Sequence, residues 1–203
     1  MNRDMLKIIQ NVDLQDMEMQ IALQCSPLIS GIKISNLLII PSEQLQGVKC
    51  ILERTTFSYY IINTTSDKET LLLYDEHRIN SYLKDWRARN LLRRMGYSDI
   101  DLQAVLTQFS QRYRSYMRIK GEFPHEMGVI LGYPMEDIEG FIENHGKNFL
   151  CIGYWKVYEN APAKKKLFQQ YERVTKRNLK MVSHGIHIDE VVRYYAEEPR
   201  EVV

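Results

Sequence analysis

Apolar residues recur at intervals of three and four along much of the chain, the spacing that places them on one face of a helix. The segment 13–25 predicts an amphipathic helix of this kind. Ser26 and Pro27 then match the preferences of an N-cap and a first helical turn, so we expect a second, short helix toward Gly31. Similar spacing and start signals predict further helices over 42–53, 76–95, 98–120, 124–131, 134–143, 161–182 and 188–196.

Strand-like segments are either continuously apolar or rich in β-branched and aromatic residues. They lie near residues 37–40, 57–64, 69–74 and 149–158. The second and third flank the polar sequence SDKE and predict an antiparallel hairpin. Gly153 interrupts the fourth, where we expect a bulge or a close backbone neighbour.

These segments together predict a single α+β domain, with a small antiparallel or mixed sheet packed against seven or more helices. The sequence contains no internal repeat and no linker rich in Pro, Gly or Ser. We expect the domain to span residues 1–180 and to be followed, over 181–203, by a C-terminal extension with a short helix and a charged tail.

Composition and charge narrow the classes of function. The chain has 203 residues, of which 44% are hydrophobic, enough for a real core. Its formal net charge of +1 argues against a uniformly basic nucleic-acid-binding surface. The three cysteines are widely spaced, and no window resembles a signal peptide or a membrane span. We therefore expect a soluble cytoplasmic protein without a membrane partner.

The stretch FPHEMGVILGYP, residues 123–134, combines a histidine and a glutamate with two glycines and two prolines. The zinc-peptidase pattern H-E-x-x-H would need a second histidine at position 129, where Val129 stands. Other candidate ligand sets are His125 with His145 and Cys151, or His184 with His187. Gly185 weakens the second set, and we predict no metal and no cofactor. Before any chemical role is considered, the stretch predicts two short helices joined by a Gly-Tyr-Pro turn.

A thiol enzyme is one hypothesis. Cys25 would lie before the helix start at Ser26, where backbone N–H groups favour a thiolate. His125 would be the base, oriented by Glu126 or Asp137. The structural alternative is a buried Cys25 and a helix-capping His125, and it stays open at this point.

Ligand binding is a second hypothesis, because aromatic residues cluster around the glycines of GYP and GYWKVY. The candidate ligand-binding residues are Tyr133, Cys151, Tyr154 and Trp155. A pocket formed by them would lie near Cys25 and His125.

Binding of a polyanion or nucleic acid is a third hypothesis. Two stretches are rich in Lys and Arg, and one of them contains Trp86, which could stack on a base. The candidate phosphate-binding residues are Arg87, Arg93, Arg94, Lys165, Arg173 and Lys176. The alternative is an ordinary solvated helix face.

Residues 123–158 also carry the series His-Glu-x-Gly, Leu-Gly-Tyr-Pro, Gly-Phe-Ile-Glu-Asn and Gly-Tyr-Trp-Lys-Val-Tyr. This series resembles the hallmark segment of an uncharacterised bacterial family, a domain of unknown function, whose N-terminal Cys-x-Pro segment is similar to LQCSP here. The resemblance implies no established reaction, and at most an accessory role in metal or redox physiology. The leading expectation is thus an accessory protein that binds a small ligand or a protein partner.

Overall fold

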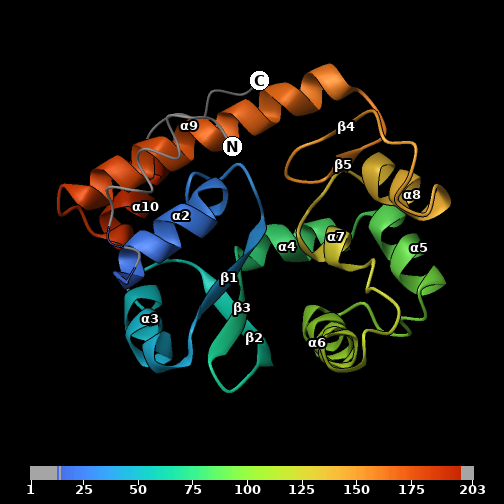
Figure 1. Ribbon diagram of the computed structural model, residues 1–203, viewed down its shortest axis with the longest axis horizontal. Helices are drawn as coiled ribbons and strands as arrows, with labels where there is room; N and C mark the ends of the chain where they lie inside the picture. The colour runs from blue at the N-terminus through green and yellow to red at the C-terminus, as the bar shows by residue number, and fades with distance from the viewer. Residues whose placement is uncertain (1–12, 14, 198–203) are drawn as a thin grey trace.

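The computed structural model describes residue 13 and residues 15–197. In this part of the chain nine α-helices surround a small sheet (Figure 1). The helices are α2 (Met17–Ile29), α3 (Leu45–Leu52), α4 (Glu76–Leu83), α5 (Trp86–Arg94), α6 (Leu102–Ile119), α7 (Met127–Ile130), α8 (Met135–Glu143), α9 (Ala161–Ser183) and α10 (Ile188–Glu197). A short 3-10 turn over Ser42–Gln44 precedes α3.

The main sheet has three antiparallel strands in the order β1-β3-β2, so that β3 (Lys68–Tyr74) is central. β1 (Ser35–Pro41) and β2 (Ser58–Thr64) flank it, and β2 carries a bulge between Ile61 and Asn63. A separate two-stranded sheet joins β4 (Cys151–Ile152) to β5 (Lys156–Val157). The predicted α+β fold with a small antiparallel sheet and seven or more helices is confirmed.

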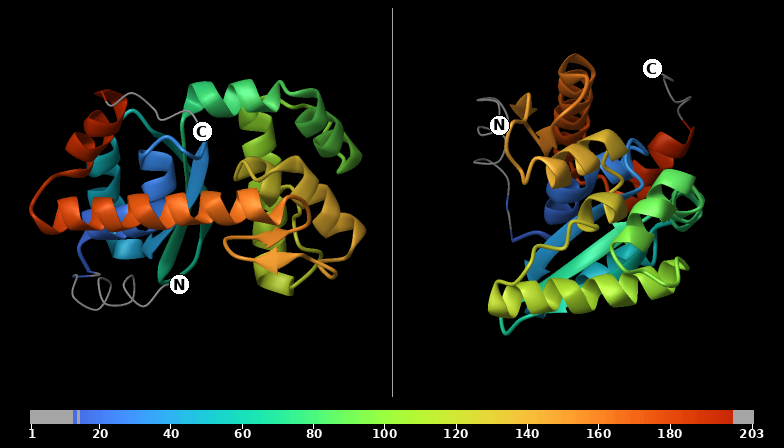
Figure 2. Two further views of the ribbon diagram at one scale, coloured as in Figure 1. Left: turned by 90° about the horizontal axis from the view of Figure 1, so that it is seen from above. Right: turned by 90° about the vertical axis from the view of Figure 1, so that its right-hand side faces the viewer.

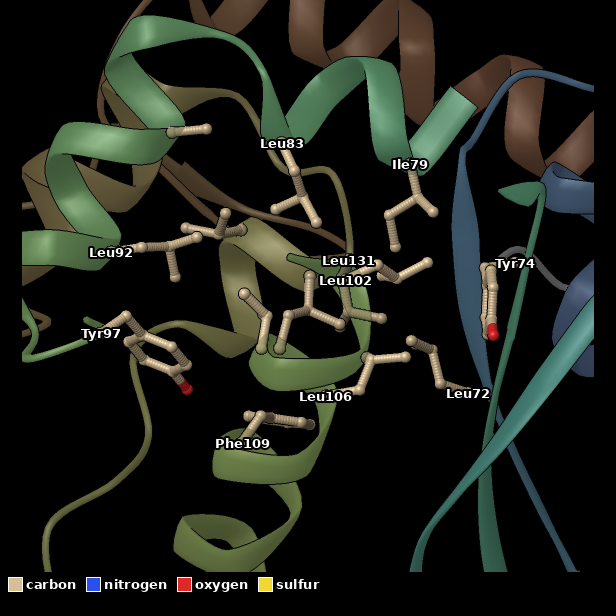
Figure 3. Close-up of a cluster of buried hydrophobic side chains, with 14 of the residues drawn as sticks. Leu72, Tyr74, Ile79, Leu83, Leu92, Tyr97, Leu102, Leu106, Phe109 and Leu131 are labelled. Carbon is tan, nitrogen blue, oxygen red and sulfur yellow. The ribbon is translucent and has the colours of Figure 1, made fainter. Parts of the chain in front are cut away.

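Strand β3 is buried on both faces, and its alternating side chains enter two different cores. Leu72 and Tyr74 belong to the first core, built by β2, β3 and helices α4 to α8. Figure 3 shows the Leu72 side chain pointing toward Leu106 of α6, while the Tyr74 ring is seen edge-on beside the strands. Leu71 and Leu73 belong to the second core, built by α2, β1, α3, β3, α9 and α10. This two-sided burial explains why the second half of the strand, Leu71–Tyr74, is continuously apolar instead of alternating.

Helix α9 runs along most of the molecule, above α2 and beside α10 at one end and over the β4-β5 hairpin at the other (Figures 1 and 2). Its buried Leu179 packs in the second core. Phe168 and Tyr171, two and three turns into the helix, form a third cluster with Trp155 and Val157. One helix therefore connects the second core to the hairpin.

Two local predictions were wrong. The chain does not start a new helix at Ser26, because α2 continues to Ile29 with Pro27 inside it. The segment 149–158 is a hairpin of two-residue strands and not one strand. Gly153 lies in its turn, and a Cβ there would come within 2.3 Å of the Phe168 ring, so the close neighbour is a side chain of α9 and not the backbone segment that was expected.

The C-terminal helix α10 is an integral part of the second core. Its side chains Ile188 and Val191 are fully buried. A buried polar bridge also holds it, since the Asn178 amide donates to Ser26 Oγ at 3.0 Å and accepts from the Tyr195 hydroxyl at 2.9 Å. Asn178 has no exposed surface, so it joins α2, α9 and α10 away from water.

No helix within the described ranges combines the length and the apolar character that crossing a bilayer requires.

We expect Asn178→Ala to lower the free energy of unfolding by about 1–3 kcal/mol, because it removes this partner from the buried Ser26 hydroxyl and from the hydroxyl of the half-buried Tyr195. Urea denaturation followed by circular dichroism measures the change. Gln169→Ala is the matched control, since Gln169 lies exposed on the same helix. Equal stabilities of the two variants would contradict the structural role of the Asn178 bridge.

Candidate functional site

Lys33 lies in the short connection between α2 and β1, and hydrogen bonds fix its backbone. Gly31 adopts a positive φ of 71°, which lets the chain turn away from α2. The Lys33 N–H then donates to the Pro27 carbonyl at 2.8 Å. Arg78 of α4 donates to the carbonyls of Gly31 and Lys33 at 2.8 and 2.9 Å. The position of Lys33 is therefore determined by both neighbouring elements.

The Lys33 side chain is buried without a counter-ion. Only 8% of the residue is exposed, and its ammonium lies 5.3 Å from the centroid of the Tyr133 ring. No hydrogen bond or ion pair to this ammonium occurs among the described residues. Burial lowers the pKa of Lys33 to about 8, and the nearby Cys25 thiol opposes this in part. Burying a charged lysine without a partner lowers the free energy of unfolding.

Lys33 lines a cavity of about 710 Å³. Aromatic side chains from three parts of the chain form much of its wall: Tyr133 between α7 and α8, Tyr154 and Trp155 in the β4-β5 turn, and Phe168 and Tyr171 on α9. Asn36, Glu172 and Thr175 add polar groups. The cavity thus offers one cationic group and a largely aromatic interior.

The aromatic side chains are packed against one another in defined geometry. Tyr133 stacks on Trp155 with centroids 4.7 Å apart and planes 27° apart. Trp155 meets Phe168 edge to face at 4.6 Å, and Tyr154 meets Tyr171 in the same manner at 5.0 Å. Such contacts hold the rings in place and leave their remaining faces for a ligand.

The turn that carries Trp155 is held by the buried carboxylate of Asp137 on α8. Its Oδ2 accepts from the indole Nε1 of Trp155 at 2.7 Å, and its Oδ1 accepts from the backbone N–H groups of Tyr158 and Glu159 at 2.7 and 3.2 Å. Asp137 is only 2% exposed. This residue therefore positions the hairpin, and it makes no hydrogen bond to His125.

A second cavity of about 310 Å³ shares part of its wall with the first, including Tyr133, Tyr154 and Trp155. His125 lines this second cavity between the rings of Phe123 and Phe141, at centroid distances of 5.6 and 5.5 Å. Its Nδ1 atom is buried and has no hydrogen-bond partner in the described part of the chain. His125 thus belongs to an aromatic row, and no acid orients it.

Cys25 does not have the environment that the thiol-enzyme hypothesis requires. It lies inside α2, fully buried in the second core, where its Sγ contacts the Leu37 carbonyl oxygen at 3.7 Å. Burial raises the pKa of the thiol to about 12, opposite to the direction that a nucleophile needs. The helix start that was expected to stabilise a thiolate is absent, because α2 continues past Ser26.

Glu126 makes contacts different from those expected of a residue orienting His125. It is 3% exposed, and its Oε1 accepts from the Tyr97 hydroxyl at 2.9 Å and from Arg112 at 3.3 Å. The Arg112 guanidinium also lies over the Tyr97 ring at 4.9 Å. Burial and the adjacent Glu126 raise the pKa of Tyr97. These contacts join α6 to the turn before α7.

The predicted phosphate-binding residues lie on two helices with acidic groups between them. Arg93 and Arg94 are exposed on α5, Lys165 and Arg173 are exposed on α9, and Lys176 is half-buried. On α8, Glu139 pairs with Arg87 at 2.9 Å and Glu136 pairs with Lys164 at 2.6 Å. These carboxylates reduce the positive potential between the two helices.

The histidine and cysteine candidates for a metal site are separated. The described residues contain no group of three or more His, Cys, Asp and Glu side chains able to hold a metal ion. His187 Nδ1 lies 3.1 Å from Glu18, whereas His184 Nδ1 lies 2.6 Å from the Lys180 carbonyl oxygen. Cys151 is half-buried and packs against the third cluster.

Of the ligand-binding candidates, Tyr133, Tyr154 and Trp155 line one cavity. Sequence reasoning missed Lys33, the cationic residue among those that line that cavity. The signal available was a single lysine within the otherwise apolar and small-residue run GIKISNLLII.

A protein-family model described as "Protein of unknown function (DUF3793)" matches residues 21–192. The chain belongs to this family. The DUF3793 match covers Lys33, the aromatic wall of the cavity and the first residues of α10. The resemblance to a family of unknown function is therefore confirmed. No curated protein and no solved structure matches the chain.

The buried lysine predicts a pH-dependent stability. Below about pH 8 both the folded and the unfolded chain carry the Lys33 charge, and the folded state bears the cost of burying it. Above that pH the folded protein releases this proton before the unfolded chain does, so the contribution of Lys33 to the free energy of unfolding rises toward pH 10.5, whereas the raised pKa of the Cys25 thiol acts in the opposite direction above pH 9. The pKa difference corresponds to about 3 kcal/mol.

We therefore expect Lys33→Met to raise the free energy of unfolding at about pH 7 by roughly 1–3 kcal/mol, and the gain to shrink at about pH 9.5. Urea denaturation at both pH values measures the difference in the free energy of unfolding between Lys33→Met and the parent protein. The raised pKa of Cys25 acts in both proteins and does not create this difference. Lys166→Met, on the exposed face of α9, is the control. A Lys33→Met variant no more stable than the parent at pH 7 would count against a buried, unpaired charge.

Proposed function

We propose that this protein binds a small molecule with an aromatic or apolar body and an anionic group, in the cavity that Lys33 lines. The observation that carries the proposal is Lys33, a residue only 8% exposed whose ammonium has no counter-ion in the described structure, in the wall of a cavity of about 710 Å³. A volume of this size suits a small organic ligand.

The charge of Lys33 determines which ligand would gain most from binding. An ammonium that has already lost much of its hydration interacts strongly with an anion, because little further desolvation opposes the contact. A carboxylate, sulfonate or phosphate beside Lys33 would offset the cost of the buried charge. The ligand would in this way supply the partner that the described protein residues do not.

The aromatic side chains determine the shape of the remainder of the ligand. Tyr133, Trp155 and Phe168 present flat faces and edges in one region of the cavity. A planar or branched apolar group would pack there by dispersion and by removal of apolar surface from water.

A cytoplasmic accessory role is part of the same proposal. The chain has three cysteines, and all three are free, which is typical of a reducing compartment. A role in metal or redox physiology rests on the family resemblance alone, and no side-chain cluster described above adds to it.

Binding of anilinonaphthalene sulfonate, an anionic aromatic dye, tests the proposal. The chain has two tryptophans, and Trp86 is 71% exposed whereas Trp155 lies in the cavity wall. In a Trp86→Phe background, quenching of Trp155 emission therefore reports on the cavity. We expect Lys33→Met to weaken dye binding by roughly tenfold or more, since a charge-assisted contact contributes about 1.5–3 kcal/mol. Affinity in the parent should fall as pH rises above about 8, where Lys33 loses its proton.

Lys166→Met is the matched control, because it removes one exposed lysine from α9 and leaves the cavity intact. Nile red, a neutral dye, separates charge from apolar contact, and Lys33→Met should bind it as well as the parent does. Dye binding that does not quench Trp155, or that is equally strong in Lys33→Met, would contradict the proposed site.

A further inference from the structure

We propose that the Lys33 amine also condenses with small aromatic aldehydes in this cavity, forming a reversible imine. The inference rests on the proposed function, since it requires that small molecules enter the same cavity. The inference adds a covalent reaction to the proposed binding function. It also names aldehydes as a second class of ligand, beside the anionic one.

The surroundings of Lys33 differ from those of other lysines whose contacts are defined. The Lys164 ammonium pairs with Glu136 at 2.6 Å, and the Lys156 ammonium donates to the Gly146 carbonyl at 2.7 Å. Such contacts hold the nitrogen in its protonated form. The Lys33 nitrogen has neither kind of partner within the described chain, and it borders a cavity.

Burial of the side chain favours a neutral amine at Lys33, while Cys25 and the face of the Tyr133 ring act in the opposite direction and do not cancel its effect. Cys25 of α2 is a protonated thiol, Tyr133 presents its ring, and Arg78 binds the adjacent carbonyls. Glu172 lines the cavity but makes no ion pair with Lys33. With its pKa lowered to about 8, roughly a quarter of Lys33 is neutral at pH 7.5, compared with about one part in a thousand of an ordinary lysine.

The reaction conserves atoms and needs no oxidant or reductant. The nitrogen lone pair of the neutral amine attacks the aldehyde carbon, and the carbon–oxygen double bond opens. A proton moves from nitrogen to oxygen and gives a carbinolamine. Protonation of this hydroxyl, loss of one water molecule and formation of the carbon–nitrogen double bond then give the protonated imine, which releases its nitrogen proton to give the neutral imine. The Glu172 carboxylate, in the wall of the same cavity, is a group able to carry protons between these steps.

The cavity wall selects the aldehyde. Tyr133, Trp155 and Phe168 can hold an aromatic ring while its carbonyl carbon faces the amine. The partial exclusion of water also favours the imine, because its hydrolysis requires water at the same carbon.

Reductive trapping tests the inference on the full chain. The protein is incubated with naphthaldehyde and cyanoborohydride near pH 7.5, and peptide mass spectrometry measures the rate of labelling at each lysine. We expect Lys33 to be labelled roughly tenfold or more faster than Lys166, because of its larger neutral fraction. Naphthoate, which fills the same space without a reactive carbonyl, should slow labelling at Lys33 alone.

Lys33→Arg removes the amine that would form the imine, because a guanidinium does not condense with the aldehyde in this way. We expect it to lose the fast labelling at position 33, whereas Lys166→Met, on the exposed face of α9, should keep both dye binding and the fast labelling of Lys33. If the parent binds the dye but labels Lys33 no faster than Lys166, the aldehyde chemistry is wrong and the binding function stands. If dye binding fails as well, both are wrong. Fast labelling that naphthoate does not slow would place the reaction outside the cavity and would overturn the inference. This competition uses only the parent protein, so it does not depend on whether a variant folds.

Discussion

Strand β3 must bury side chains on both of its faces, and the positions of the other elements follow from this requirement. Helix α6 and its neighbours cover Leu72 and Tyr74, while α2 and α10 cover Leu71 and Leu73. Because α2 covers one face and its chain must continue into β1 of the same sheet, only residues 30–34 are available to make the turn. Lys33 lies in that turn and is buried as a result.

The cavity depends on a second constraint, the attachment of a hairpin too short to be stable by itself. β4 and β5 contribute two residues each, so backbone pairing between them supplies little stability. Asp137 instead binds the indole of Trp155 and the backbone that follows it, while Phe168 fills the space left by the missing side chain of Gly153. A buried carboxylate and one glycine thus hold the aromatic wall opposite the loop of Lys33.

Much of the fold was predictable from the sequence because burial leaves local patterns. Residues 71–74 are continuously apolar because two cores share them, and the long α9 has apolar residues at helical intervals. Pro27 was misinterpreted for a physical reason. Proline usually marks a helix start, yet here the burial of Cys25, Leu28 and Ile29 in the second core stabilises a helix that continues through it.

The site was only partly predictable. Tyr133, Tyr154 and Trp155 were identified because aromatic residues near glycines are locally unusual, and they do line one cavity. Lys33 was missed because its burial arises from contacts with α4 and with the loop after α7, 45 residues or more away along the chain. The same holds for Arg112 and Tyr97, whose pairing with Glu126 depends on how α6 packs. Contacts between distant segments leave no periodic signal.

Tyr133, Tyr154 and Trp155 stand in the wall of both cavities, so one set of rings separates the Lys33 amine from the His125 imidazole. A ligand in the larger cavity that displaced these rings would change the space in the smaller one, and the effect of each ligand on the affinity for the other would then be equal in free energy. The His125 Nδ1 atom, which has no hydrogen-bond partner among the described residues, is the polar contact that a ligand of the smaller cavity would meet.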